Sequence, residues 1–238
     1  MENEILGYKK GISIFITAYH TIDYIDSTLE SVYNQDWFED HDNWEVIVIC
    51  DGDDEIFEHL KTSSYRNFRL FKTKENVGTY VASNTAARLC QYDWIMRFDS
   101  DDLMEPNCVS TVMSNVKYNL DAIYYRGPRW GRTPIAVGQV CIKHDLFNTL
   151  GGFQPWPCSA DTNLKLRLIP YCRIKFLHDN LITFRERPDS LTSNDITGLH
   201  TDTREKYREI NRNTFITKPE DAIIDYTVTE YDEFIFAK

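Results

Sequence analysis

The first hundred residues alternate short apolar segments with helical patterns, and this alternation limits the chain to a small set of folds. Residues 11–17 form a β-branched run that begins at a glycine, and apolar residues then recur at helical spacing over residues 21–33. Further strands are predicted at residues 44–50, 68–71 and 94–98, and further helices at residues 54–60 and 79–90. Strands that alternate with helices indicate a mostly parallel sheet covered on both faces, so an α/β fold is predicted.

The second half of the sequence continues with helices and strands, but the connections are longer. A helix is predicted at residues 107–119, and a polar helix at residues 201–213 precedes an acidic tail. The other predicted elements are strands at residues 122–125, 135–143, 174–178 and 181–184, a helix at residues 161–168, and an edge strand at residues 223–228. Two long loops rich in Gly, Pro and Trp, at residues 126–132 and 151–157, have the composition of functional loops.

Charge is unevenly distributed along the chain. The 26 Lys and Arg against 37 Asp and Glu give a net charge of −11, which disfavours a nucleic-acid partner held mainly by net positive charge. Residues 35–59 contain ten acids and no Lys or Arg, whereas residues 121–190 contain ten Lys and Arg against six acids. The second stretch is therefore where an anionic ligand could be tolerated.

The sequence predicts neither a leader peptide nor a membrane span. The first four residues, 1–4, are acidic where a signal peptide needs a basic start, and no apolar run approaches the roughly 18 residues of a span. The six cysteines are widely spaced, which favours reduced thiols over a disulfide framework or a zinc site. We therefore expect a soluble, cytoplasmic protein with no transmembrane anchor.

Three aspartates directly after the predicted strand at residues 94–98 are candidates for chemistry. Asp99, Asp101 and Asp102 would lie at the carboxyl end of a parallel strand, which is the edge where open α/β sheets bind ligands. Carboxylates so close together repel one another unless a cation joins them, and hard oxygen ligands select Mg²⁺ or Mn²⁺. Such an ion would bridge to a diphosphate and stabilise its departure. The alternative is an acidic turn that caps the next helix.

Other polar segments also follow predicted strands or begin predicted helices. They are residues 17–20 after the first strand, residues 51–52 after the second, and residues 76–78 before the helix at residues 79–90. These segments and the aspartates can converge on one edge of one sheet, where a nucleotide would fit.

Six motifs in this order resemble those of the family-2 glycosyltransferases, enzymes of the GT-A fold that transfer a sugar from a nucleotide diphosphate. They are residues 12–19, 29–35, 46–52, 75–78 with 83–84, 99–102 and 150–153. The resemblance implies a Rossmann-like, mostly parallel central sheet flanked by helices. The implied domain covers residues 1–195, with a nucleotide-binding half at about 11–105, an acceptor half at about 106–195, and a C-terminal helix and acidic tail at 196–238.

The same resemblance implies a donor site residue by residue. Thr17 and Tyr19 would flank the nucleobase, typically a uracil, and Asp51 would hydrogen-bond it. Asn76 and Gly78 would belong to the same nucleotide site. The alternatives are a packed surface aromatic for Tyr19 and a plain turn for Asp51.

The implied metal site departs from the family pattern. Asp99 and Asp101 would serve the ribose and the Mn²⁺ or Mg²⁺ ion, with Asp101 the firmer metal ligand. The family often has a histidine where this chain has Arg187, and an arginine cannot ligate a cation but could contact the diphosphate. His178 is the nearest substitute for the third protein ligand.

Two other positions depart from the family pattern. Cys50 stands where a first aspartate is common, and Ser83 stands where an arginine or lysine is frequent. Lys74 or Arg97 would then supply the positive charge.

Asp161 matches the family aspartate that acts as general base. An acceptor hydroxyl has a pKa far above 7, so a carboxylate must take its proton as the new C–O bond forms. With one base and no evident nucleophile, the reaction should invert the anomeric carbon. The family more often has Glu where this chain has Ala160, which affects acceptor positioning more than the identity of the base. The alternative for Asp161 is an acid that caps a helix.

The acceptor site is predicted in the two long loops. Arg129 and Trp130 could grip phosphates and stack on a sugar or a base, and Gly152 and Trp156 belong to the second loop. A glycan, a protein, a small molecule and a polynucleotide all stay open as acceptors.

We therefore predict a metal-dependent, inverting hexosyl- or pentosyltransferase that uses a nucleotide diphosphate sugar, by preference a UDP-sugar. One alternative is a nucleotidyltransferase, although the Gly-rich basic phosphate loop that such an enzyme needs does not occur in residues 1–24. A second is a catalytically impaired nucleotide-sugar binding protein. A third is a protein that mainly binds a partner through its acidic tail.

Overall fold

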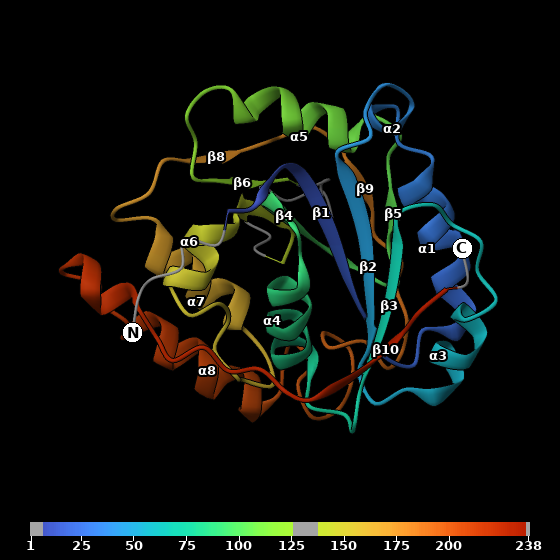
Figure 1. Ribbon diagram of the computed structural model, residues 1–238. Coiled ribbons are helices and arrows are strands. Elements are labelled where there is room, and N and C mark those ends of the chain that lie inside the picture. The colour runs from blue at the N-terminus through green and yellow to red at the C-terminus, as the bar shows by residue number, and fades with distance from the viewer. Residues whose placement is uncertain (1–6, 126–137, 237–238) are drawn as a thin grey trace.

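The chain folds around an eight-stranded sheet with helices on both faces (Figure 1). The structure is a computed structural model that describes residues 7–125 and 138–236. The strands are β1 (Lys9–Ala18), β2 (Trp44–Cys50), β3 (Phe68–Thr73), β4 (Tyr92–Asp99), β5 (Leu103–Met104), β6 (Ala122–Tyr124), β7 (Val140–Lys143), β8 (Ile174–Phe176), β9 (Ile182–Thr183) and β10 (Tyr231–Phe234). The helices are α1 (Ile22–Tyr33), α2 (Trp37–Asp40), α3 (Asp54–Leu60), α4 (Thr79–Leu89), α5 (Cys108–Val116), α6 (His144–Thr149), α7 (Ala160–Leu168), α8 (Asp202–Arg212) and the 3₁₀ turn η1 (Pro219–Ala222).

Four parallel strands form the centre of the sheet. The strand order is β10-β3-β2-β1-β4-β7-β6-β8, in which β3, β2, β1 and β4 run parallel. Strand β7 is antiparallel to both β4 and β6, and β10 is antiparallel to β3. The predicted α/β class and the mostly parallel sheet are confirmed, and so is the order of the helices and strands in the first hundred residues, apart from the short helix α2, which was not predicted.

Side chains of each central strand alternate between two cores, one on each face of the sheet. In β1, Ile12, Ile14 and Ile16 pack with α1, α3 and α5, whereas Phe15 points to the opposite face and packs with α4, α6 and α7. Both faces are therefore buried, which is why the strands read as nearly continuous apolar segments.

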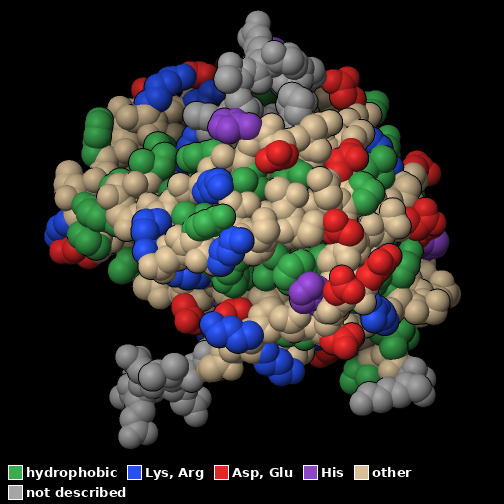
Figure 2. Space-filling model, turned by 90° about the horizontal axis from the view of Figure 1, so that it is seen from above, with side chains coloured by type: hydrophobic (Ala, Val, Ile, Leu, Met, Phe, Trp, Pro, Cys, Tyr) green, Lys and Arg blue, Asp and Glu red, His purple; other side chains and the backbone are tan. Residues whose placement is uncertain are grey.

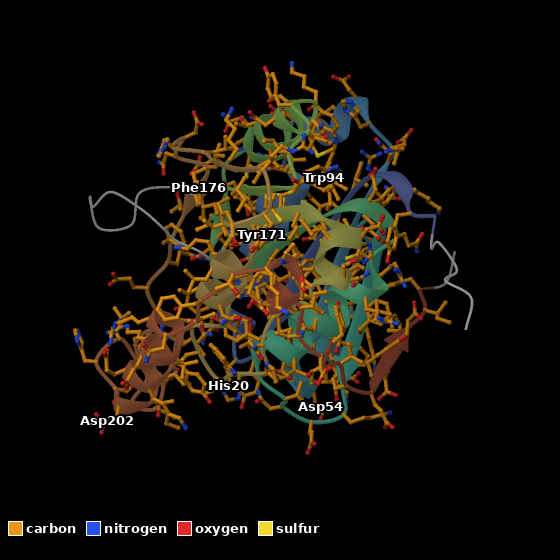
Figure 3. The ribbon with its side chains drawn as sticks, turned by 90° about the vertical axis from the view of Figure 1, so that its left-hand side faces the viewer. His20, Asp54, Trp94, Tyr171, Phe176 and Asp202 are labelled. Atoms are coloured by element: carbon orange, nitrogen blue, oxygen red, sulfur yellow. The ribbon has the colours of Figure 1, made fainter. Side chains whose placement is uncertain are left out.

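The carboxyl ends of the parallel strands lie together at one edge of the molecule. In Figure 3, His20 after β1 and Asp54 after β2 lie at the lower edge, and Asp202 at the start of α8 lies on the same side. Trp94, near the start of β4, lies toward the opposite edge. Loops that follow different strands are thus brought to one edge, as the sequence predicted.

The predicted edge strand at residues 223–228 is wrong, because the edge strand forms at β10 instead. Residues before β10 cross the surface of α4, where the Asn84 side chain donates to the Thr227 carbonyl at 3.1 Å. The Tyr226 hydroxyl donates to the Asn84 carbonyl at 3.0 Å, and the Thr229 amide donates to the Thr85 hydroxyl at 3.1 Å. The tail therefore binds a helix before it reaches the free side of β3.

The uneven charge along the sequence is visible on the surface. Figure 2 shows that Asp and Glu side chains gather on the right of that view, which is the side of α1, α2 and α3, whereas Lys and Arg predominate on the left. No helix in residues 7–125 or 138–236 is long and apolar enough to cross a membrane.

His144 makes the fold sensitive to acid. Its side chain is fully buried, its Nδ1 donates to the Tyr92 carbonyl at 3.1 Å, and its ring stacks on Tyr8 at 3.8 Å between centroids. Burial lowers the pKa of His144 from 6.5 to about 4. Between these two pH values the unfolded chain binds a proton that the folded chain does not bind. The free energy of unfolding therefore rises with pH across this window, and the contribution of His144 is lost on acidification.

We expect the His144 contribution to amount to about 3 kcal/mol between pH 4 and 6.5. Urea denaturation at several pH values checks this. The variant His144→Asn keeps a hydrogen-bond donor but does not titrate, so its stability should vary less with pH than that of the parent. The exposed His200 supplies the control His200→Asn. An unchanged pH slope in His144→Asn would contradict the assignment.

Candidate active site

A cleft of about 1130 Å³ opens where the central parallel strands end. The loops after β1, β2, β3 and β4 form one wall, and residues 184–199 with α7 and α8 form the other. Nine residues predicted for the donor and catalytic sites line it together: Thr17, Tyr19, Asp51, Asn76, Gly78, Asp99, Asp101, Asp161 and Arg187.

Asp51 organises one end of the cleft. Its Oδ1 accepts from the Val77 amide at 2.9 Å and its Oδ2 accepts from the Gly78 amide at 3.0 Å, and the residue is 1% exposed. Burial raises the pKa of the Asp51 carboxyl above its ordinary value, and these hydrogen bonds, which favour the charged form, offset only part of that rise. Gly52 is required beside it, because a Cβ there would lie 2.3 Å from the Asn76 nitrogen. Asp51 thus fixes the loop that carries Asn76 and Gly78.

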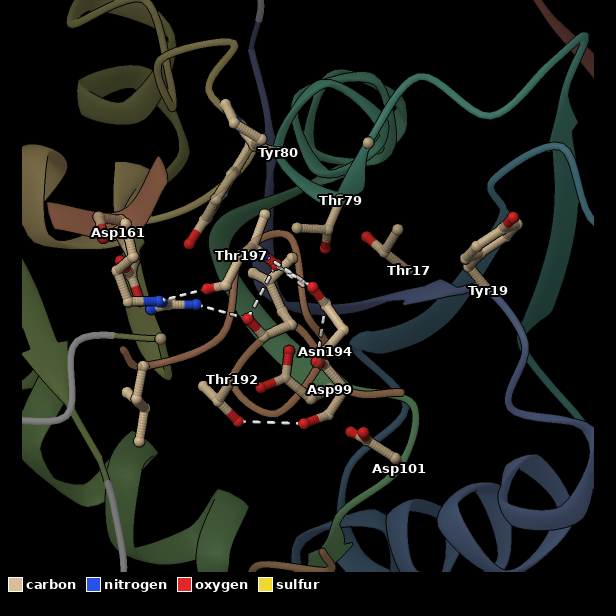
Figure 4. Close-up of a pocket in the computed structure, with 18 of the residues that line it drawn as sticks. Thr17, Tyr19, Thr79, Tyr80, Asp99, Asp101, Asp161, Thr192, Asn194 and Thr197 are labelled. Atoms are coloured by element: carbon tan, nitrogen blue, oxygen red, sulfur yellow. Dashed lines mark hydrogen bonds between the residues drawn. The ribbon is translucent and has the colours of Figure 1, made fainter. Parts of the chain in front are cut away.

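Thr17 and Tyr19 lie at the same end of the cleft (Figure 4). The Thr17 hydroxyl and the Ser83 hydroxyl are 2.9 Å apart, so Ser83 packs against the strand end and does not supply charge. Tyr19 is 39% exposed, and its ring stacks on His20 at 3.9 Å between centroids. An exposed, oriented aromatic on a cleft wall is suited to stacking on a base.

Each of the two aspartates predicted at the metal site is paired with an arginine. Arg97 Nη2 lies 2.6 Å from Asp99 Oδ1, and Arg187 Nε donates to Asp101 Oδ2 at 2.7 Å. The two guanidinium groups offset the repulsion between the neighbouring carboxylates. Asp102 differs, since it is 5% exposed and its Oδ1 accepts from the Arg185 amide at 3.0 Å.

Arg185 fastens the segment that carries Arg187. Its Nη1 donates to the Ser27 hydroxyl at 2.6 Å, its Nη2 to the Thr28 hydroxyl at 2.6 Å, and its Nε to the Asp101 carbonyl at 2.5 Å. These bonds tie the return segment to α1 and to the acidic turn, and so hold Arg187 beside Asp101.

The donor set fits a divalent cation that is shared with a ligand. Among the residues that the structure describes, no three His, Cys, Asp or Glu side chains form a metal site by themselves. Asp99 and Asp101 both line the cleft, and Mg²⁺ is commonly held by one or two carboxylates together with substrate phosphates. A cation at this turn would therefore depend on the phosphates of a bound ligand.

Asp161 lies on the wall opposite Tyr19, with Asp99 between them (Figure 4). It is the second residue of α7, and its Oδ1 accepts from the Thr162 amide at 2.7 Å. A Cβ on Gly138 would lie 3.6 Å from Asp161 Oδ2 and 3.9 Å from Asp99 Oδ2. Both carboxylates therefore face the same small volume, which the missing side chain of Gly138 leaves open.

Arg97 is a buried cation between these two carboxylates. It is 6% exposed and donates from Nη1 to the Gly138 carbonyl at 2.7 Å. Burial lowers the pKa of Arg97, but Asp99, Tyr80 and Asp161 together raise it, and the net shift is upward. Burial and the charge of Asp161 raise the pKa of Tyr80, so its hydroxyl stays protonated as a donor on the cleft wall.

Lys74 and Arg97 were the two residues expected to supply the positive charge that the family often has at the position of Ser83. Arg97 lies at the site, whereas Lys74 pairs with Asp232.

The structure does not bring His178 to the site. It is exposed and is not among the described residues that line the cleft. It follows β8, which lies three strands from β4, a separation of roughly 14 Å at about 4.8 Å per strand. Phe176, at the end of β8, also lies away from the edge that carries His20 (Figure 3).

The expected acceptor contacts at Gly152 and Trp156 are also corrected, because neither is among the described residues of the cleft wall. Gly152 lies against Asn84, whose Oδ1 would be 2.4 Å from a Cβ, and Trp156 packs on Tyr207 of α8 at 5.0 Å between centroids. The loop at residues 126–132, with Arg129 and Trp130, lies outside the described residues.

Several residues of the cleft were not anticipated from the sequence. They are Tyr80, Gln139, residues 189–197, and the α8 residues Arg204, Arg208, Asn211 and Arg212. The recurrence of arginine every four residues in α8 was the available signal for that face. Helix α8 also packs on α7 across the predicted boundary at residue 195, since Asn163 donates to Asn211 at 3.2 Å.

The sequence and the fold are similar to those of known proteins. Chondroitin synthase from Escherichia coli is 30% identical over 156 residues, which is 57% of this chain but only 22% of that protein. The structure of Staphylococcus aureus TarS (residues 1–349) with UDP-GlcNAc superposes with a TM-score of 0.67 at 16% identity, over 89% of this chain and 69% of that chain. The mannosyltransferase PcManGT from Pyrobaculum calidifontis, in complex with GDP-Man and Mn²⁺, gives a TM-score of 0.58 at 23% identity, over 73% of this chain and 56% of that chain.

These two structures confirm the predicted GT-A fold. The sequence model of glycosyl transferase family 2 matches residues 13–135, which include the strand ends that carry Thr17, Asp51 and Asp99. Because this match covers more than half of the chain, the protein belongs to glycosyl transferase family 2.

Proposed function

We propose that this chain transfers a sugar from a nucleoside diphosphate sugar, by preference a UDP-sugar, to a hydroxyl of a glycan with inversion at the anomeric carbon. The observation that carries the proposal is the position of Asp161, which faces Asp99 across one cleft of about 1130 Å³. A leaving diphosphate and a proton acceptor are needed on opposite sides of the reacting carbon, and a donor whose diphosphate lay at Asp99 and Asp101 would place that carbon between them and Asp161. Family membership favours this activity over nucleotidyl transfer.

The nucleoside would bind at the end of the cleft formed by Tyr19 and the Asp51 loop. The diphosphate would then lie near Asp101 and Arg187, where the guanidinium group can donate paired, charged hydrogen bonds. The UDP-GlcNAc bound to TarS and the GDP-Man bound to PcManGT support a nucleoside diphosphate sugar as donor.

Asp161 would take the proton of the acceptor hydroxyl as its oxygen attacks the anomeric carbon. The Thr162 amide holds one oxygen of the carboxylate and leaves the other toward the space beside Gly138. A single displacement with one base and no protein nucleophile inverts the configuration. The name of the E. coli relative, a chondroitin synthase, supports a glycan acceptor.

Asp99 and Asp101 would hold a divalent cation jointly with the donor phosphates. Such an ion supplies positive charge that stabilises the departing diphosphate. Mn²⁺ in the PcManGT complex supports this part of the proposal.

Donor binding tests the proposal, and Asp101→Asn tests the cation site. At a hundredfold excess over its Kd, UDP with Mn²⁺ should raise the Tm by about 5–10 °C, because a ligand that binds only the folded state stabilises it. In Asp101→Asn the part of this shift that requires Mn²⁺ should be lost, since an amide is a poorer cation ligand than a carboxylate. Thermal shifts with UDP, GDP and CDP, each with and without Mn²⁺, measure both effects.

The exposed Asp179, which lies away from the cleft, provides the control Asp179→Asn. This control should keep the full Mn²⁺-dependent shift. If none of the three nucleotides stabilised the parent protein, the proposed donor class would be wrong. Release of UDP from a UDP-sugar with Mn²⁺ separates an enzyme from an impaired binding protein.

A further inference from the structure

The cleft extends past the base to a face of arginines on α8. Arg204, Arg208 and Arg212 recur every four residues and therefore lie along one side of the helix. All three line the cleft. The Thr201 side chain caps the helix by accepting from the Arg204 amide at 3.3 Å, which fixes where this face begins.

Helix α8 is fixed next to the proposed base. The Asn211 side chain donates to the Ser159 carbonyl at 3.1 Å and accepts from the Asn163 side chain at 3.2 Å. Ser159 and Asn163 flank Asp161 at the start of α7. Asp161 lies across the cleft from Tyr19 (Figure 4). Because Asn211 ties α8 to the two residues that flank Asp161, the arginine face lies on the Asp161 side of the cleft.

Two of the three arginines on this face, Arg208 and Arg212, share one acidic partner, Glu205. Arg204 is 8% exposed and donates to the carbonyls of Thr197 and Leu191, both at 2.5 Å, so its part is mainly structural. The side chains of Arg208 and Arg212 are 40% and 63% exposed, and both contact Glu205, at 3.4 Å and 2.5 Å. Arg208 Nη1 also donates to the Leu199 carbonyl at 2.9 Å. Exposed ion pairs of this kind contribute little, so an anionic ligand can compete with Glu205 for the two guanidinium groups.

The size of the cleft allows a second substrate to reach this face. Single small-molecule sites usually occupy about 300–1,000 Å³. The present cleft, at about 1130 Å³, lies above this range, and it reaches from Tyr19 to the arginines of α8. The space adjoining Asp161 is where an acceptor hydroxyl must lie if the proposed function is correct.

We propose that Arg208 and Arg212 form an anion subsite for the acceptor, so that the acceptor carries a carboxylate or a phosphate near the hydroxyl that is glycosylated. Planar guanidinium groups bind both kinds of anion through paired hydrogen bonds. This inference rests on the proposed function, because it defines the acceptor of the same reaction.

Matched pairs of probes test the subsite by calorimetric titration of the protein with UDP and Mn²⁺ present. The carboxylate pair is p-nitrophenyl β-D-glucuronide against p-nitrophenyl β-D-glucoside, and the phosphate pair is glycerol 3-phosphate against glycerol. In at least one pair the anionic member should bind about tenfold or more tightly than its neutral match. The pair that shows the preference identifies the anion.

Substitutions locate the effect at α8. In the double variant Arg208→Gln/Arg212→Gln the preference should be lost. The control Arg88→Gln/Arg173→Gln removes the same charge from exposed positions outside the cleft and should keep it. Equal binding within both pairs, or a preference that survives in the double variant, would overturn the subsite.

The same titration separates this inference from the proposed function. If UDP binds but neither pair shows a preference, the subsite is wrong and the donor proposal stands. If UDP does not bind but an anionic probe binds at Arg208 and Arg212, the donor proposal is wrong, and the anion site exists but is not an acceptor subsite of that reaction.

Discussion

The variant Asp161→Asn is expected to lower kcat for sugar transfer by about 10²–10⁴-fold while the Kd for the donor stays unchanged. The amide cannot take the proton of the acceptor hydroxyl. Its oxygen can still accept the hydrogen bond from the Thr162 amide, which is 2.7 Å from Asp161 Oδ1, so the start of α7 should keep its structure. Transfer kinetics under saturating donor, together with titration of UDP, measure the two quantities separately.

Asp145→Asn provides a control at an equivalent position in another helix. Asp145 is the second residue of α6, as Asp161 is of α7, but it is exposed and lies away from the cleft. The control should transfer sugar at the parental rate. Full transfer by Asp161→Asn would show that the base is another group, and a parallel loss of donor affinity would show that Asp161 acts in donor binding.

The variant Gly151→Ala should destabilise the fold by about 2–5 kcal/mol. Gly151 has a φ of +80°, a left-handed conformation that costs an L-residue about 1–2 kcal/mol. A Cβ there would also lie 1.9 Å from the Ile224 carbonyl oxygen, and forced overpacking costs about another 1–3 kcal/mol. Relief of this contact would displace the tail from the loop, where the Ile224 amide donates to the Leu150 carbonyl at 3.2 Å.

The variant Gly78→Ala separates the conformational cost of a positive φ from the cost of the steric clash. Gly78 also has a positive φ, +88°, but no described atom lies within 4 Å of a Cβ built on it. Its ψ is 147°, close to a region that is essentially limited to glycine, so its substitution should cost only the conformational part, about 1–3 kcal/mol. Urea denaturation of both variants checks the difference. Equal losses of stability would mean that the close approach of the tail to Gly151 does not matter.

The edge of the sheet that carries the candidate site was predictable from the sequence because its residues follow strands directly. Thr17, Asp51 and Asp99 each stand at or just after the end of an apolar run, and parallel strands end at the same edge of a sheet. Once the alternation of strands and helices was clear, the position of these side chains followed within a residue or two. The identity of the acidic turn and the order of the motifs then indicated the family.

Residues that reach the cleft from elsewhere in the chain were not predictable in this way. Arg208 and Arg212 line it only because Asn211 ties α8 to the start of α7, and the sequence does not encode this contact locally. Conversely, Gly152 and Trp156 seemed suited to an acceptor, but Gly152 lies against Asn84 and Trp156 packs on Tyr207.

The sequence by itself determined the α/β class, the parallel centre of the sheet and the residues at its carboxyl edge, since periodicity and chain order are local properties. Tertiary structure alone decided the pairing of Asp101 with Arg187, the distance of His178 from the site and the binding of the tail to α4 before β10. These features depend on the path that the chain takes after residue 106. That path is set by packing and hydrogen bonds between segments far apart in sequence, which no local pattern records.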